Sequence, residues 1–245
     1  MATVISLIVL WEATVKILAI PTYILPAPAL VMRSLVEDIG VLLPNALFTM
    51  GEILLGFALS AGLGIAAAIV IACWPIAEKT LYPILVGLQM LPKIALAPLF
   101  VMWLGFGYLP KVLIIVLIAS FPIVLNTVSG IRSVETEKLY LLQSMGASGL
   151  QTFLKVRFPS ALPSIFTGLK IASTLAVIGA IVGEFIAADR GLGRILILSN
   201  ASLDTPLLFA GVVLLSIMGF LLYSVIELSE RVLVHWHGSN RARQQ

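Results

Sequence analysis

Residues 132–163, RSVETEKLYLLQSMGASGLQTFLKVRFPSALP, determine how the rest of the chain is arranged. They form the longest polar-leaning interval in a sequence that is otherwise nearly all hydrocarbon. This interval must therefore lie in water between two membrane-spanning segments.

The first half of the interval predicts a short helix that ends at a glycine. Ser133 is placed to cap its start, and Leu139, Leu142 and Met145 recur on one face at spacings of three. Gly146 is suited to the left-handed conformation that commonly terminates a helix.

The second half predicts another short helix. Ser148 and Gln151 have the spacing of a capping box, in which each side chain bonds the other residue's backbone N–H. Pro159 and Pro163 are expected to stop this helix and open the next span. A short amphipathic helix held at a membrane face by a glycine hinge and two prolines is suited to a partner protein's groove.

The composition excludes a soluble domain. The chain has 245 residues, of which 60% are hydrophobic and 11% charged, and its mean hydropathy is +1.11. The apolar runs are continuous rather than alternating, which favours spanning helices over a barrel. The net charge of +3 requires no nucleic-acid partner, and Cys73, the single cysteine, excludes an internal disulfide. The segment before Val4 is not basic, so we expect the N-terminus to be retained rather than cleaved as a signal peptide.

The fold class predicted is an all-α membrane protein, a polytopic bundle of about six transmembrane helices in a single domain, 1–245. A bilayer core needs roughly 20 apolar residues per helix, so six spans would use about half the chain. We place the spans at residues 4–20, 48–72, 81–104, 110–131, 164–188 and 205–227, with the loop 132–163 between the fourth and fifth.

The two N-terminal segments are the least regular. Glu12 and Lys16 interrupt the first span at a spacing that lets them form an ion pair. Residues 25–38 fit either a short amphipathic helix at the outer surface or a plain loop.

The second and third spans carry ionisable groups and prolines. Gly51, Gly56, Gly62 and Gly64 give the second span a thin side for close packing. Glu52 either faces a partner or a pathway, or extends to the membrane interface. In the third span, three prolines (Pro83, Pro92 and Pro98) and Lys93 favour a helix bundle or transport cavity over bare lipid, because proline leaves backbone carbonyls unsatisfied.

The later spans and the tail contain fewer polar groups. The fourth span includes Asn126, and the fifth has a Gly179–Gly183 pair suited to close packing, followed by Glu184 near its outer end. Two histidines in the tail, His235 and His237, are expected to be solvated rather than metal ligands.

The placement of basic residues favours a cytoplasmic loop and C-terminus. With the loop inside, the inner side collects Lys79, Arg132, Lys138, Lys155, Arg157, Arg231, Arg241 and Arg243. The outer side has Lys16, Arg33, Lys111, Arg190 and Arg194.

The sequence contains no phosphate-binding G-x-x-x-x-G-K-[ST] motif, so the chain is not expected to bind ATP in the usual way. A membrane enzyme would need a catalytic constellation, and the intramembrane acids are scattered. A stand-alone secondary transporter or channel is the alternative; it would predict an inverted repeat and acid or histidine relays within spans, and the sequence has neither.

The polar interval resembles the cytoplasmic "EAA" loop of binding-protein-dependent ABC transporter permeases. In that pattern Gly146 is followed by apolar residues at Val156 and Phe158 and by Pro159. The triplet that names the loop is replaced by residues 140–142, Tyr-Leu-Leu, so an acidic contact would be missing or supplied by Glu137 or Glu135.

The resemblance extends over nearly the whole chain, through LPAP, LLGFAL, MLPKIALAPLFVMWLGFG, NTVSGIRSV, GEFIAADRGLG and DTPLLFAGVVLLSIMG. These segments are similar to the permease subfamily for nitrate, sulfonate, taurine and pyrimidine precursors. That similarity implies an ABC importer permease in the bacterial inner membrane, not itself an enzyme, that pairs with a second copy. Two cytoplasmic ATPase subunits would bind ATP and Mg, so this chain would hold no cofactor, and a periplasmic or lipid-anchored binding protein would deliver solute.

The resemblance also implies two sets of site residues. The ATPase-coupling set is Glu137, Leu139, Tyr140, Leu142, Gln143, Met145, Gly146, Ala147, Ser148 and Pro159. The translocation-pathway set is Glu52, Met90, Pro92, Lys93, Pro98, Asn126 and Glu184. Anion importers of the subfamily tend to carry a basic residue where Glu52 stands. We therefore expect an uncharged or heterocyclic solute, such as a pyrimidine precursor or a vitamin, ahead of a sulfonate, taurine or nitrate.

Overall fold

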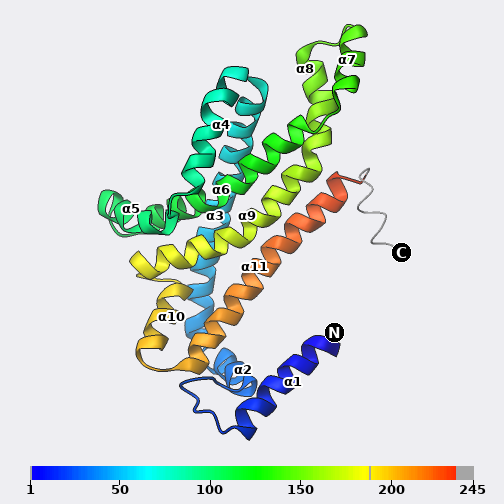
Figure 1. Ribbon diagram of the computed structural model, residues 1–245. Coiled ribbons are helices and arrows are strands. Elements are labelled where there is room, and N and C mark those ends of the chain that lie inside the picture. The colour runs from blue at the N-terminus through cyan, green and yellow to red at the C-terminus, as the bar shows by residue number, and fades with distance from the viewer. Residues whose placement is uncertain (1, 188, 236–245) are drawn as a thin grey trace.

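The computed structural model describes residues 2–187 and 189–235, which form helices joined by short loops (Figure 1). The helices are α1 Ala2–Ile17, α2 Pro28–Glu37, α3 Ile39–Cys73, α4 Pro75–Gln89, η1 Lys93–Leu96, α5 Ala97–Leu104, α6 Tyr108–Arg132, α7 Thr136–Ser144, α8 Gly149–Thr152, η2 Phe153–Arg157, α9 Phe158–Ala187, α10 Leu192–Ala201 and α11 Thr205–Leu233. The all-helical class predicted from the sequence is confirmed.

Helices α3, α6 and α9 form the centre of the bundle, and glycines allow them to approach closely. A Cβ on Gly64 of α3 would lie 3.1 Å from Ile123, and one on Gly179 of α9 would lie 3.0 Å from the Cα of Ile115. The predicted packing roles of Gly179 and its neighbour Gly183 are therefore confirmed. Gly62 has nothing within 4 Å, so its predicted packing role is wrong.

Among the described residues, four helical runs are long and apolar enough to cross a membrane: Ile39–Cys73, Tyr108–Arg132, Gly149–Ala187 and Thr205–Leu233. They correspond to the second, fourth, fifth and sixth predicted spans. The first predicted span forms α1, which has 16 residues and falls short of the roughly 20 that a bilayer core requires.

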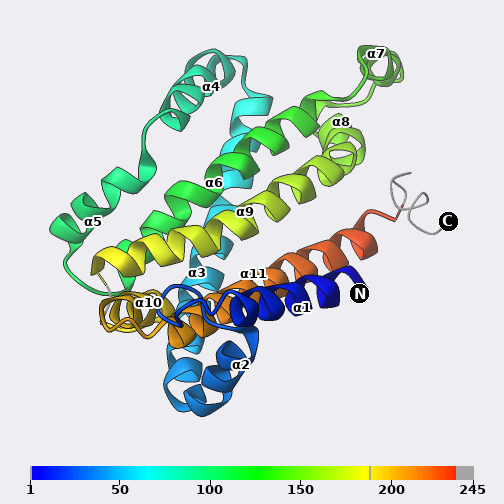
Figure 2. The ribbon, with the colours of Figure 1, turned by 60° about the horizontal axis from the view of Figure 1, so that its bottom comes forward.

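The third predicted span is broken rather than kinked. Its two parts, Pro75–Gln89 and Lys93–Leu104, meet at 88°. Helices α4 and α5 therefore form a bent helix pair beside α6 (Figure 2). Pro92 has non-helical backbone angles (φ −70°, ψ 84°), and a proline disfavours helical geometry in the residue before it. The helix therefore ends at the break instead of bending through it.

The N-terminal segments pack at the end of the bundle opposite α7 and α8 (Figure 1). The predicted Glu12–Lys16 pair forms at 2.8 Å, and Glu12 also accepts the N–H of Ala29 at the start of α2. Residues 28–37 are helical, so the alternative of a plain loop is wrong.

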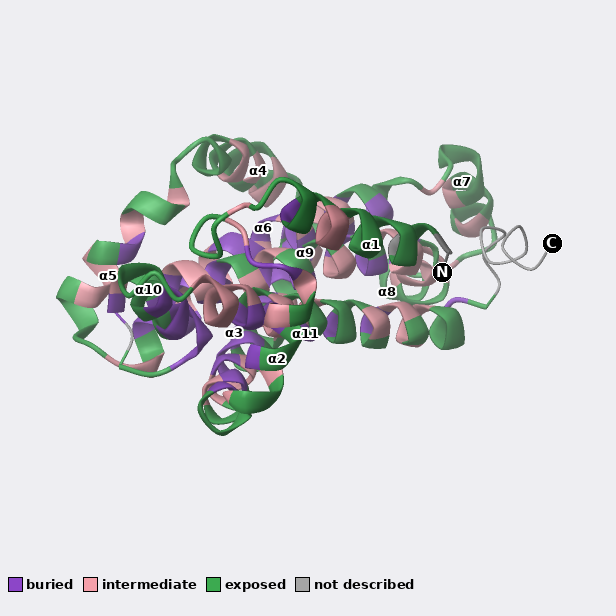
Figure 3. Cartoon of the chain, turned by 90° about the horizontal axis from the view of Figure 1, so that it is seen from below, coloured by how far each residue is buried: buried purple, intermediate pink, exposed green. Residues whose placement is uncertain are grey.

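Two elements differ from the sequence-based expectation. Residues 192–201, between the fifth and sixth predicted spans, form the ten-residue helix α10, which packs on α9 and α11. Residues 149–187 form one helical run, so Pro159 and Pro163 do not interrupt it. The long helix α9 does begin next to Pro159, at Phe158, as predicted. The π-helical segment η2 comes just before Pro159, and such a widened turn accommodates the proline ring and its missing N–H. Buried residues gather along α3, α6, α9 and α10, whereas α7 has none (Figure 3).

Candidate functional site: the helical loop and the buried polar cluster

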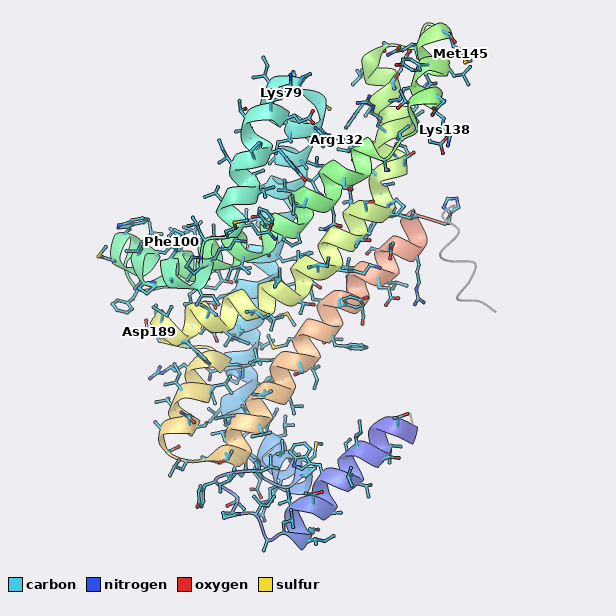
Figure 4. The ribbon with its side chains drawn as sticks, in the orientation of Figure 1. Lys79, Phe100, Arg132, Lys138, Met145 and Asp189 are labelled. Carbon is cyan, nitrogen blue, oxygen red and sulfur yellow. The ribbon has the colours of Figure 1, made fainter. Side chains whose placement is uncertain are left out.

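The loop between α6 and α9 carries two helices at one end of the molecule (Figure 4). Lys79, Arg132, Lys138 and Met145 lie at this end, whereas Asp189 lies far from it. Arg132 pairs with Glu78 at 2.6 Å, which joins the base of the loop to the α3–α4 turn.

Helix α7 does not begin as predicted. Ser133 has helical backbone angles (φ −70°, ψ −6°) and its hydroxyl donates to the carbonyl of Gly130, so it closes α6. An N-cap requires extended backbone, which Glu135 adopts immediately before α7. The predicted capping role of Ser133 is therefore wrong.

The end of α7 follows the prediction for Gly146. This residue has φ +76°, its N–H donates to Gln143, and the N–H of Ala147 donates to Leu142. The pair of bonds is a Schellman motif, in which a left-handed residue satisfies the last carbonyls of a helix. Gly146 has open space around it, so the backbone conformation alone requires glycine there.

The start of α8 also follows the prediction. The N–H of Gln151 donates to Ser148 Oγ, and the N–H of Ser148 donates to Gln151 Oε1. The capping box is complete and fixes the direction in which the chain leaves the glycine hinge.

The predicted coupling residues divide into four groups by position. Glu137, Tyr140, Met145, Gly146 and Ser148 are exposed, and Leu139 and Leu142 are half-buried. Gln143 and Ala147 line a groove of about 550 Å³ between the loop and the end of α3, which also includes Cys73 and Arg157. Pro159 lies in the first turn of α9, beyond the two loop helices.

The predicted pathway residues do not form one site. Met90, Pro92 and Pro98 are exposed along the broken α4–α5 segment. Lys93 lies over the ring of Phe121 at 4.6 Å. The amide of Asn126 donates to the carbonyl of Pro122 in its own helix.

Glu52 is enclosed rather than extended to the membrane interface. Its Oε1 lies 2.6 Å from Nζ of Lys111 in α6, with side-chain exposures of 0% and 2%. Lys111 also lies over the ring of Phe48 at 4.7 Å. Because Glu52 is paired and enclosed, it gives no reason to exclude an anionic solute, and that part of the sequence argument fails.

Glu184 lies in the same enclosed region and is fully hydrogen-bonded. Its Oε1 accepts the hydroxyl of Thr49 at 2.6 Å, and its Oε2 accepts the N–H of Gly193 at 2.5 Å. The hydroxyl of Thr49 also accepts the N–H of Leu192, and Asn45 accepts the N–H of Gly191. Three successive backbone donors of residues 191–193 are thus bound by side chains of α3 and α9.

Lys111, Thr49 and Asn45 were not predicted as site residues. Lys111 was counted as an outer-side cation, and Thr49 and Asn45 look like ordinary polar residues at a span end. Of these three residues, only Lys111 could have been singled out from the sequence. It lies within a predicted span, and a lysine is rarely fully buried unless it is paired.

Comparison with known proteins connects these features. The family model described as "Binding-protein-dependent transport system inner membrane component" matches residues 60–235, which include the loop, the groove and Glu184. The chain belongs to this family.

Named members of the permease family align along most of this chain. The formylaminopyrimidine transport permease ThiX of Halalkalibacterium halodurans is 38% identical over 231 residues, covering 94% of this chain and 92% of that protein. The riboflavin permease RibX of Chloroflexus aurantiacus is 36% identical, covering 97% and 89%. The taurine permease TauC of Escherichia coli is 30% identical, covering 96% and 88%.

An inward-facing structure of the MetNI methionine ABC transporter shares the fold. The TM-score is 0.62 at 19% identity, covering 78% of this chain and 97% of that chain. The protein is thus a multi-pass permease subunit of an ABC importer, a class that works with an ATPase and a solute-binding protein. The alternative of a stand-alone transporter is not supported.

Proposed function

We propose that this permease passes an organic, heterocyclic solute and is driven through the loop that bears α7 and α8. The observation that carries the proposal is the loop itself: residues 132–150 include no buried side chain, although the end of α7 and the start of α8 are capped. A helical pair whose exposed faces are left uncovered by its own chain is suited to a partner's groove.

The partners follow from the family. Two cytoplasmic ATPase subunits, which bind ATP and Mg, would receive the loop of this chain and of a second permease copy. Tyr140 and Met145, which are 66% and 75% exposed, are the apolar anchors of that contact. Tyr140 stands where the family pattern has glutamate. The contact with the ATPase subunit would therefore be apolar at a position where the family pattern makes it acidic. An external binding protein would deliver the solute to the opposite end.

We retain only part of the predicted pathway set as residues that would line the solute pathway. Lys93, Met90, Pro92 and Pro98 lie together on the broken segment, where proline-freed carbonyls need a protein or water partner. Asn126 lies half-buried on α6, the helix against which Lys93 packs through Phe121. Glu52 and Glu184 are enclosed, so they would not touch the solute. They would act by holding α3, α6, α9 and the start of α10 together.

The solute class rests on two relatives. The permeases named for formylaminopyrimidine and riboflavin are 38% and 36% identical to this chain, and the one named for taurine is 30% identical. A thermal-shift screen of the cognate binding protein tests the choice, with pyrimidine precursors and flavins in one arm and sulfonates, taurine and nitrate in the other. Stabilisation by the second arm alone would reverse it.

Separate experiments test which side of the membrane the loop faces and whether the ATPase subunits power uptake. In a Cys73→Ala background, Met145→Cys should resist a membrane-impermeant maleimide in intact cells, whereas Leu203→Cys, 66% exposed at the other end, should react. Reconstituted uptake should require the ATPase subunits. Reaction of Met145→Cys from outside, or uptake without any ATPase, would overturn the proposal.

A further inference from the structure

Three ionisable side chains from three helices share one enclosed region. Glu52 of α3, Lys111 of α6 and Glu184 of α9 are 0%, 2% and 1% exposed. If all three were ionised, the region would hold one uncompensated negative charge. An isolated charge away from water is strongly unfavourable, and such groups neutralise instead.

The hydrogen bonds show where a neutralising proton fits. Both oxygens of Glu184 already accept donors, from Thr49 and Gly193. Both oxygens of Glu52 are buried without a well-aligned hydrogen bond, although Lys111 Nζ is 2.6 Å from Oε1.

Other charged or titratable groups approach the pair from the packed elements. Tyr108 of α6 faces Glu52. Asp189 and Arg194 line a cavity of about 280 Å³ that reaches Glu184, and the guanidinium of Arg194 donates to the carbonyl of Asp189. Lys111 lies within ion-pair distance of the Glu52 carboxyl group.

We propose that the Glu52–Glu184 pair binds one proton in this conformation, carried by Glu52. The proton leaves Lys111 as a cation and Glu184 as an anion, so the enclosed set is neutral. Glu184 can then hold the N–H of Gly193 as a carboxylate, which is the stronger acceptor.

Infrared spectroscopy of the full-length chain in lipid nanodiscs tests the proposal at neutral pH. The wild-type chain should show the C=O absorption of a protonated carboxyl group, shifted when the chain carries ¹³C-labelled glutamate. Glu52→Gln and Glu184→Gln should each abolish it, because one carboxyl beside Lys111 ionises. Lys111→Met should increase it about twofold, because both enclosed carboxyls are then neutral.

Glu37→Gln is the matched control, because Glu37 is exposed and paired with Arg33; it should leave the absorption unchanged. Absence of the absorption in the wild-type chain would overturn the proposal, whether or not the variants fold. Its persistence in both Glu52→Gln and Glu184→Gln would do the same. Neither result bears on the solute or on the ATPase.

Discussion

Gly56 of α3 and Ile115 of α6 are packed so closely that a Cβ on Gly56 would lie 2.5 Å from Ile115 Cγ2. Gly62, two turns along the same helix, has nothing within 4 Å. The two positions therefore separate the effect of packing from the effect of helix propensity.

Gly56→Ala should destabilise the bundle by about 1–3 kcal/mol, because the added methyl group overpacks a rigid contact. Gly62→Ala should leave stability unchanged or raise it slightly, because alanine favours a helix more than glycine does. Unfolding in detergent measures both. Equal stabilities for the two variants would show that α3 and α6 are not in this contact.

Gly146→Val should preserve membrane insertion and abolish ATP-driven uptake. A β-branched residue cannot easily hold φ +76°, and the left-handed conformation costs roughly 1–2 kcal/mol for a residue with a Cβ. Gly146→Asn should retain partial uptake, because asparagine tolerates this conformation. Reconstituted uptake and the amount of protein in the membrane fraction are the measurements, and normal uptake by the valine variant would contradict the hinge.

Ser148→Ala should loosen the start of α8 by about 1 kcal/mol, because the cap hydroxyl is lost. Hydrogen exchange at the Gln151 amide, which donates to this hydroxyl, should accelerate. Ser144→Ala is the control, since its hydroxyl donates to a carbonyl within α7. An unchanged rate at Gln151 would indicate that the box does not form.

Asn45→Ala should speed hydrogen exchange at the Gly191 amide by about two- to tenfold, as expected for one lost hydrogen bond. The side-chain Oδ1 of Asn45 accepts the Gly191 N–H at 2.8 Å. Asn126→Ala removes an asparagine that bonds only its own helix and should leave Gly191 unaffected. Equal exchange rates at the Gly191 amide in the two variants would show that this amide is not hydrogen-bonded to α3.

Glu184→Lys should prevent the chain from folding rather than alter the kinetics of a folded transporter. It puts a second ammonium beside Lys111 at a site that is 1% exposed, and an unpaired buried charge is strongly destabilising. Glu184→Gln, which keeps the shape without the charge, should be recovered as folded protein. Folded Glu184→Lys with altered uptake would instead place this residue at a solvated cavity.

Local signals in the sequence predicted local structure well. The glycine at 146 and the Ser148–Gln151 pair each act within one turn, so their spacing alone identifies them. Ser133 failed because a serine near a helix boundary can close one helix or open the next, and the backbone angle decides.

Long-range relationships were beyond the sequence. The three prolines of the third span did not show that it would break, and the 88° angle depends on how α5 packs against α6 and α9. Glu52, Lys111 and Glu184 lie far apart in the chain, and hydropathy does not show which helices are neighbours. The π-helical segment before Pro159 has no sequence signature that distinguishes it from a helix stop.

The unbroken run Gly149–Ala187 has 39 residues, which corresponds to roughly 58 Å of helix. It begins beside the capped hinge and ends three residues after Glu184. A displacement of α8 therefore acts on a lever whose far arm carries the carboxylate that grips Gly193. Motion applied at one face of the membrane would arrive at the other as a tilt, without an intervening flexible joint.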